Sequence, residues 1–155
     1  PAGMYNDTVF PLGHHGASGV AFEAGVIGKN LTEWQYGLAS TNPRWNVSGT
    51  YMQVLPRFVS VDKNGNEYEF LADYFEDKYE ALSMVFLKGY QWPFSYERAG
   101  KSSRIDIAVH NETSKGRRVY LDYTCNPVGF SFEKLCDEAK SYIINVNKEI
   151  WRLQK

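Results

Sequence analysis

The stretch RFVSVDKNGNEYEF, residues 57–70, restricts the fold more than any other part of the chain. Two runs rich in β-branched and aromatic residues, 58–62 and 66–70, flank the pair Asn64-Gly65. This pair accepts the positive φ values of a type I′ turn, whose twist matches that of paired antiparallel strands. We therefore predict a β-hairpin here.

Further strands are predicted in three places. LTEWQYGLAS, residues 31–40, is rich in aromatic residues and alternates as a strand does. VSGTYMQVL, residues 47–55, ends before Pro56, which cannot donate a ladder hydrogen bond. RIDIAVH and RRVYLDY, residues 104–110 and 117–123, are joined by the turn-rich NETSKG and predict a second hairpin.

Apolar residues at helical spacing predict three helices. The first runs from Ser18 as N-cap to the glycines at 25 and 28, and the second from Leu71 to Gly89. The third follows Ser131 and continues almost to the end of the chain. Because strands and helices are grouped rather than alternating, we predict an α+β fold, with two β-hairpins of antiparallel strands packed by about three helices.

The composition narrows the classes of function. The 155 residues suit one domain, and 17 Lys+Arg against 18 Asp+Glu leave no basic field for nucleic acid. No window is apolar enough to span a membrane, and the start lacks the features of a signal peptide, so we expect a cytoplasmic protein. Cys125 and Cys136 fit neither a disulfide framework nor a zinc pattern and are interpreted as ordinary thiols.

No motif for self-contained catalysis is present. The sequence has no Gly-x-Gly-x-x-Gly, no phosphate-binding Gly-x-x-x-x-Gly-Lys-Ser/Thr, no Gly-x-Ser-x-Gly and no His-Glu-x-x-His. Pro1 at the start and a helix that runs to Lys155 favour a piece of a longer protein, although trimming of the chain would produce the same ends.

His14 and His15 stand before a run of small residues. Adjacent histidines on an extended segment point to opposite sides, and a third ligand is missing nearby, so we predict no metal site. Gly16 and Ala17 instead leave backbone amides accessible at a helix N-terminus, which favours an anion or the polar edge of a cofactor. A small metal enzyme that uses either histidine stays an open alternative.

The order of several segments resembles the flavoprotein subunit of the fumarate reductase and succinate dehydrogenase family of FAD-dependent oxidoreductases. The resemblance covers roughly residues 13–143 and is carried by segments in the family's order. They are HHGASGVAFEAG followed by LTEWQYG, VSVDKNGNEYEFLADY, GRRVYLDYT, and DEAKSYI.

The resemblance implies a capping domain, an α+β insertion that closes over the flavin and completes the substrate site. It assigns residues 1–30 to the end of an FAD-domain-like segment, 31–130 to the capping domain, and 131–155 to a helix leading back to the FAD domain. FAD would be held mainly by the remainder of the FAD-binding domain, which this chain needs as its partner. Residues implied at the flavin are His14, His15, Gly16 and Ala17, and those implied in a pocket for a small-molecule substrate are Trp34, Tyr36 and Tyr51.

The sequence also departs from the family's pattern. Gly37-Leu38-Ala39 stands where the family has His-Pro-Thr, and Val54 stands where it has the catalytic arginine that donates a proton. Arg57, three residues later, is the candidate stand-in for that catalytic arginine. We therefore expect a cap that is inactive alone and does not belong to a typical fumarate reductase. The alternative is a stand-alone, aromatic-rich α+β module that binds sugar or protein, since Tyr, Phe and Trp are abundant.

Overall fold

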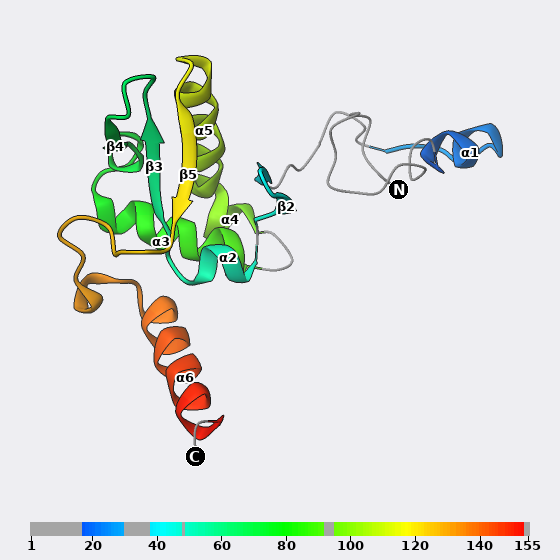
Figure 1. Ribbon diagram of the computed structural model, residues 1–155. Helices are drawn as coiled ribbons and strands as arrows, with labels where there is room; N and C mark the ends of the chain where they lie inside the picture. Colours follow the sequence, from blue (N-terminus) through cyan, green and yellow to red (C-terminus); the bar gives the residue numbers. More distant parts are fainter. Residues whose placement is uncertain (1–16, 30–37, 48, 92–94, 154–155) are drawn as a thin grey trace. The chain divides into compact units, whose positions relative to one another are not determined.

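The computed structural model of the protein describes residues 17–29, 38–47, 49–91 and 95–153. The chain divides into two compact units, Pro1–Val47 and Ser48–Lys155. Helices and antiparallel strands make up both, which confirms the predicted α+β class (Figure 1). Among the helices of the described ranges, none is long and apolar enough to cross a membrane. The assignment of 1–30, 31–130 and 131–155 to parts of a flavoenzyme stays a prediction.

The first unit contains one short helix and one small hairpin. Helix α1 spans Ala17–Glu23, so Ser18 lies inside it and is not its N-cap as predicted. Gly25 follows at φ 88°, a left-handed conformation that ends helices and suits glycine. Strands β1 (Ala39–Thr41) and β2 (Arg44–Asn46) pair antiparallel. Residues 31–37 of the predicted strand at 31–40 lie outside the described residues, and Ala39 and Ser40 belong to β1.

The second unit is built on a three-stranded antiparallel sheet in the order β4-β3-β5. Strands β3 (Arg57–Val61) and β4 (Glu67–Glu69) form the predicted hairpin, and β5 (Arg118–Asp122) pairs with the other edge of β3. In the turn Gly65 has φ 85°, and the Asp62 carboxylate accepts hydrogen bonds from the backbone amides of Asn64 and Asn66. The hairpin prediction is confirmed.

The helices of the second unit are α2 (Thr50–Gln53), α3 (Lys78–Tyr90), α4 (Tyr96–Ala99), α5 (Ser103–Ser114) and α6 (Asp137–Leu153), with short 3-10 turns at Leu71–Tyr74, Gly100–Ser102 and Phe132–Lys134. Among these helices, α5 contacts β5 and α2 packs against α3.

Two predicted strands are helices. The segment 47–55 contains α2, and the segment 104–110 lies in α5, so the predicted second hairpin is wrong. In α5 the buried residues are Ile105, Ala108 and Glu112, which share one face of a helix at steps of three and four. Burial of that face against the rest of the unit outweighs the β propensity of the isoleucines and the valine in segment 104–110.

The predicted helix at 71–89 begins later and ends later than expected. Asp77 caps α3 by accepting hydrogen bonds from the backbone amides of Tyr79, at 2.6 Å, and Glu80, at 2.9 Å. Gly89 lies inside α3 and does not end it. Glycine suits this position because α2 packs so closely that an added Cβ atom would meet the Cβ of Met52 at 2.7 Å. The predicted helix after Ser131 also begins later than expected. A 3-10 turn at Phe132–Lys134 precedes α6, and the Ser131 side chain makes no capping hydrogen bond.

The core lies between the sheet and helices α3 and α5. Phe58 and Phe70 meet edge to face with ring centroids 6.3 Å apart, and Phe86 is fully buried. A polar network crosses this core: Ser60 donates to the buried carboxylate of Glu112 at 2.6 Å, and Arg117 pairs with the same carboxylate at 3.0 Å. Burial opposes ionisation of Glu112, but the hydrogen bonds from Lys115 and Ser60 outweigh it and lower the pKa of this carboxyl.

Candidate functional site

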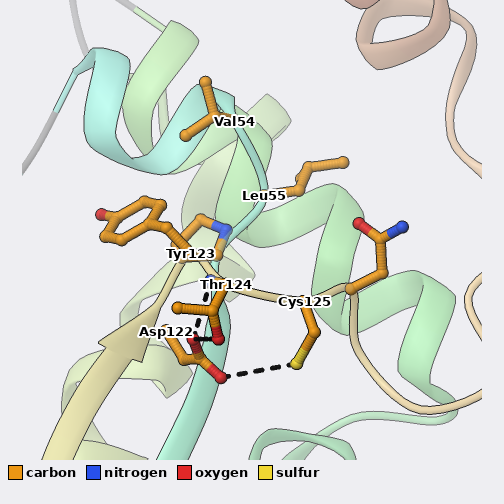
Figure 2. A pocket seen from close by; sticks show the side chains of 8 residues that line it. Val54, Leu55, Asp122, Tyr123, Thr124 and Cys125 are labelled. Atoms are coloured by element: carbon orange, nitrogen blue, oxygen red, sulfur yellow. Dashed lines mark hydrogen bonds between the residues drawn. The ribbon is translucent and has the colours of Figure 1, made fainter.

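A pocket of about 460 Å³ lies where the start of β3 meets the end of β5 (Figure 2). The two strands are antiparallel neighbours with Arg57 opposite Asp122, so the residues before β3 and after β5 come together at one end of the sheet. The lining residues are Val54, Leu55, Pro56, Asp122, Tyr123, Thr124, Cys125 and Asn126.

The wall of the pocket before β3 holds a strained residue. Leu55 has φ 54°, a left-handed conformation that costs a non-glycine residue roughly 1–2 kcal/mol. Its side chain is only 6% exposed, and its amide donates to the carbonyl of Met52 at 3.0 Å. Packing thus holds the strained turn between α2 and β3, and Pro56 fixes the backbone direction that follows.

Asp122 organises the opposite wall. Its carboxylate accepts hydrogen bonds from the amide of Thr124 at 2.8 Å, from the hydroxyl of Thr124 at 2.6 Å and from the thiol of Cys125 at 3.5 Å (Figure 2). Arg57 adds an ion pair at 2.7 Å. The hydrogen bonds from Thr124 and then Arg57 hold the pKa of Asp122 far below its usual range. Asp122 is therefore a permanent charge that shapes the loop, and it is a poor proton acceptor.

Arg57, the predicted proton donor, is the centre of an ion-pair network. Besides Asp122 it contacts Glu67 at 3.0 Å and Glu69 at 3.4 Å. The hydrogen bond to Asp122 contributes most to raising the pKa of Arg57 above that of a free guanidinium. A raised pKa makes proton donation by Arg57 harder. In addition, the described residues that line the pocket include Asp122 but not Arg57. The catalytic role of Arg57 stays a prediction.

The loop that follows β5 is tied down at its far end as well. The amide of Val128 donates to both carboxylate oxygens of Glu69 at 3.2 Å, and Lys78 Nζ donates to the carbonyl of Val128 at 3.0 Å. The Tyr79 hydroxyl donates to the carbonyl of Gly129 at 2.9 Å. Since Arg57 contacts both Asp122 and Glu69, one ion-pair network holds the two ends of the pocket-lining loop.

Tyr51, a predicted pocket residue, lies in α2 beside this site. The Tyr123 hydroxyl donates to the carbonyl of Tyr51 at 3.1 Å, and the Tyr51 side chain is half exposed. Burial, and to a lesser extent the proximity of Tyr51, raises the pKa of Tyr123. The structure therefore brings α2 and the loop after β5 into contact through these two tyrosines.

Most of the other predicted site residues are not tested by the structure. His14, His15, Gly16, Trp34 and Tyr36 lie outside the described residues. Ala17 is the first residue of α1, in the first unit. In the part of the chain that the structure describes, no group of three or more His, Cys, Asp or Glu side chains is placed to hold a metal ion.

Sequence reasoning missed most of the residues that line the pocket. The segment Asp122-Tyr-Thr does carry a signal for a side-chain-bonded turn. An Asp two residues before a Thr often accepts hydrogen bonds from the backbone amide and the hydroxyl of that Thr. Cys125 and Cys136 are both free thiols, as interpreted from the sequence. Nothing in the sequence indicated that Val54 and Asn126 line the same pocket, since that depends on the register of β3 with β5.

The fold and this site define an α+β protein with an open polar pocket at one end of an antiparallel sheet. Comparisons of the chain with models of protein families, with curated proteins and with solved structures found no match. The proposals below are therefore supported by the residues themselves, by the resemblance of the quoted segments and by the geometry of the pocket.

Proposed function

We propose that the chain is the cap and substrate domain of a flavin-dependent oxidoreductase, which closes over FAD and shapes the substrate pocket. One observation carries the proposal: Val54–Pro56 and Asp122–Asn126 line a single pocket. The first segment stands where the resembling family has its catalytic arginine, and the second continues from the family-like Val-Tyr-Leu-Asp strand. Two segments far apart in the sequence, and each singled out by the resemblance, thus meet at one concave site.

The cofactor and partners follow from the same proposal. FAD is bound by the remainder of the FAD-binding domain in the cytoplasm, and residues 1–155 alone hold no flavin and have no activity. The substrate is a small molecule, since a pocket of about 460 Å³ has the size of small-molecule sites. The enzyme is not a typical fumarate reductase, because Arg57 is held by three carboxylates at 2.7, 3.0 and 3.4 Å.

The first experiment determines the coding sequence on both sides of this chain and purifies the whole product. We expect an encoded dinucleotide fold with Gly-x-Gly-x-x-Gly and a purified protein with the absorbance of bound flavin. FAD added to residues 1–155 alone should give no stoichiometric complex. A short independent reading frame, or a whole product without flavin, would refute the proposal.

The second experiment tests the pocket in that whole product. Asn126→Trp fills the pocket, and we expect it to lower turnover at least tenfold while the flavin content stays unchanged. Ile107→Trp is the matched control, because Ile107 is 53% exposed on α5, away from the pocket lining. Equal turnover of the two variants would show that substrate does not enter this pocket.

A second candidate function is a module that binds sugar through exposed aromatic rings. The observation that favours it is that Tyr51 and Tyr123 are 43% and 50% exposed beside the pocket, where a sugar ring can stack. Titration of residues 1–155 with maltohexaose and cellohexaose, followed by tyrosine and tryptophan fluorescence, tests it. Saturable binding that Tyr51→Ala abolishes would support this function, and no spectral change with either sugar would reject it.

A further inference from the structure

The charges behind the pocket wall are unbalanced. Arg57 carries the positive charge of its cluster, whereas Glu67, Glu69 and Asp122 each contact it with a carboxylate. The low pKa of Asp122 keeps its charge at any physiological pH. This end of the sheet therefore presents a net negative potential to a ligand in the pocket, which disfavours a dicarboxylate.

The donors of Arg57 are already in use. Nε donates to Asp122 at 2.9 Å, Nη1 to Glu69 at 3.4 Å and Nη2 to Glu67 at 3.0 Å. A guanidinium binds a substrate carboxylate through two parallel N–H groups. Since every nitrogen of Arg57 contacts a carboxylate of the protein, this arginine has no free fork to offer to an anionic substrate.

The lining offers hydrogen-bond acceptors. The Thr124 hydroxyl and the Cys125 thiol both donate their hydrogens to Asp122, which leaves the lone pairs of the Thr124 oxygen for a ligand (Figure 2). The Asn126 side chain makes no hydrogen bond within the described residues, so its carbonyl is a further acceptor, next to the NH2 donor of the same amide. Pro56 has no backbone N–H to donate. Val54 and Leu55 supply apolar surface to the same pocket.

We infer that this pocket selects a small organic ammonium compound on a short apolar chain, in preference to a dicarboxylate. The ammonium group donates hydrogen bonds to the side-chain oxygens of Thr124 and Asn126. The net negative charge of the carboxylates around Arg57 attracts it. The carbon chain lies against Val54 and Leu55. This inference rests on the proposed function, in which the pocket is the substrate site.

The test uses two four-carbon probes of opposite charge. Residues 1–155, labelled with nitrogen-15, are titrated with 1,4-diaminobutane and with succinate at equal ionic strength, and the backbone amides of Leu55, Thr124, Cys125 and Asn126 are followed. We expect 1,4-diaminobutane to shift these amides saturably and succinate to leave them in place. Succinate binding as tight as that of diaminobutane, shifts spread over the whole surface, or no shift with either probe would each overturn the inference.

Variants separate specific from general attraction. Glu67→Gln removes one charge of the cluster while keeping its shape, and we expect about threefold weaker binding of 1,4-diaminobutane. Asn126→Ala removes an acceptor and should weaken binding about tenfold. Asp137→Asn is the charge-matched control, because this side chain is 96% exposed at the start of α6, and it should leave the affinity unchanged. An equal effect of Asp137→Asn and Glu67→Gln would contradict a specific site.

The two proposals fail in different ways. If the whole product contains flavin but residues 1–155 bind succinate in this pocket, the ligand class is wrong and the proposed function stands. If 1,4-diaminobutane binds here but the whole product contains no flavin, the ligand class stands and the oxidoreductase proposal is wrong.

Discussion

Gly89 controls how closely α2 approaches α3, and its replacement by alanine is the most direct test of how the pocket wall is positioned. A Cβ atom at residue 89 would lie 2.7 Å from the Cβ of Met52 and 3.3 Å from the amide nitrogen of Gln53, and closer still to the carbonyl oxygen of Gly49. Carbon atoms in contact normally lie about 3.5–4.0 Å apart, so α2 must move by roughly an ångström.

The magnitude follows from two opposing effects. Overpacking of a filled contact costs about 1–3 kcal/mol, whereas alanine in place of glycine inside a helix contributes about 1 kcal/mol of stability. The fully buried Met52 and the hydrogen bond from Gln53 to the carbonyl of Gly89, at 2.9 Å, leave α2 little freedom to adjust. The overpacking cost therefore lies in the upper part of its range, at about 2–3 kcal/mol, and after the gain of about 1 kcal/mol we expect Gly89→Ala to lower the free energy of unfolding by about 1–2 kcal/mol.

Urea unfolding followed by circular dichroism measures this change, with the slope of the transition expected to stay constant. Gly19→Ala in α1 is the matched control, because nothing lies within 4 Å of the added Cβ atom there. Since α2 leads directly into Val54–Pro56, the amide signals of the pocket wall should also shift in Gly89→Ala. A variant as stable as the wild type, with unchanged pocket signals, would refute this reasoning.

Three further changes test other parts of the second unit. Glu112→Gln should lower the free energy of unfolding by about 2 kcal/mol at neutral pH, because it removes charge-assisted hydrogen bonds in the core. Since the pKa of Glu112 is lower when folded than when unfolded, its contribution is present above the unfolded pKa and is lost as pH falls through the folded pKa. Urea transitions between neutral and acidic pH should therefore converge for wild type and variant, and a constant difference would contradict this. Asp77→Ala removes the N-cap of α3 and should destabilise by about 1 kcal/mol in the same assay, whereas Asp77→Asn should retain most of the stability. Gly65→Ala places a Cβ atom at φ 85° in the hairpin turn and should cost about 1 kcal/mol, and no loss would mean that the turn adopts another conformation in solution.

The hairpin of β3 and β4 could be predicted because its signals are local. Asn64-Gly65 accepts a turn conformation that few other pairs accept, and β-rich runs flank it on both sides. The end of α1 at Gly25 was predictable for the same reason, since a left-handed residue next to a helix favours glycine.

Segments with ambiguous periodicity were mispredicted. RIDIAVH contains enough isoleucine and valine for a strand, yet Ile105 and Ala108 are fully buried on one face of a helix. Short apolar runs cannot be assigned to helix or strand by local pattern alone, because the surface against which they pack makes the choice. The same applies to Gly89. Glycine commonly ends helices, but Gly89 lies inside α3, where the absence of a side chain lets α2 pack closely.

By itself, the sequence determined the α+β class, the hairpin at 57–70 and the absence of a self-contained nucleotide-binding motif, since these depend on composition and on neighbouring residues. Only the tertiary structure decided which residues line the pocket and what surrounds Arg57. The antiparallel register of β3 with β5 places Asp122 opposite Arg57. These residues, more than sixty positions apart in the sequence, then form an ion pair with a hydrogen bond. Pairing between distant segments is a property of the packed chain, because it depends on which surfaces become buried together.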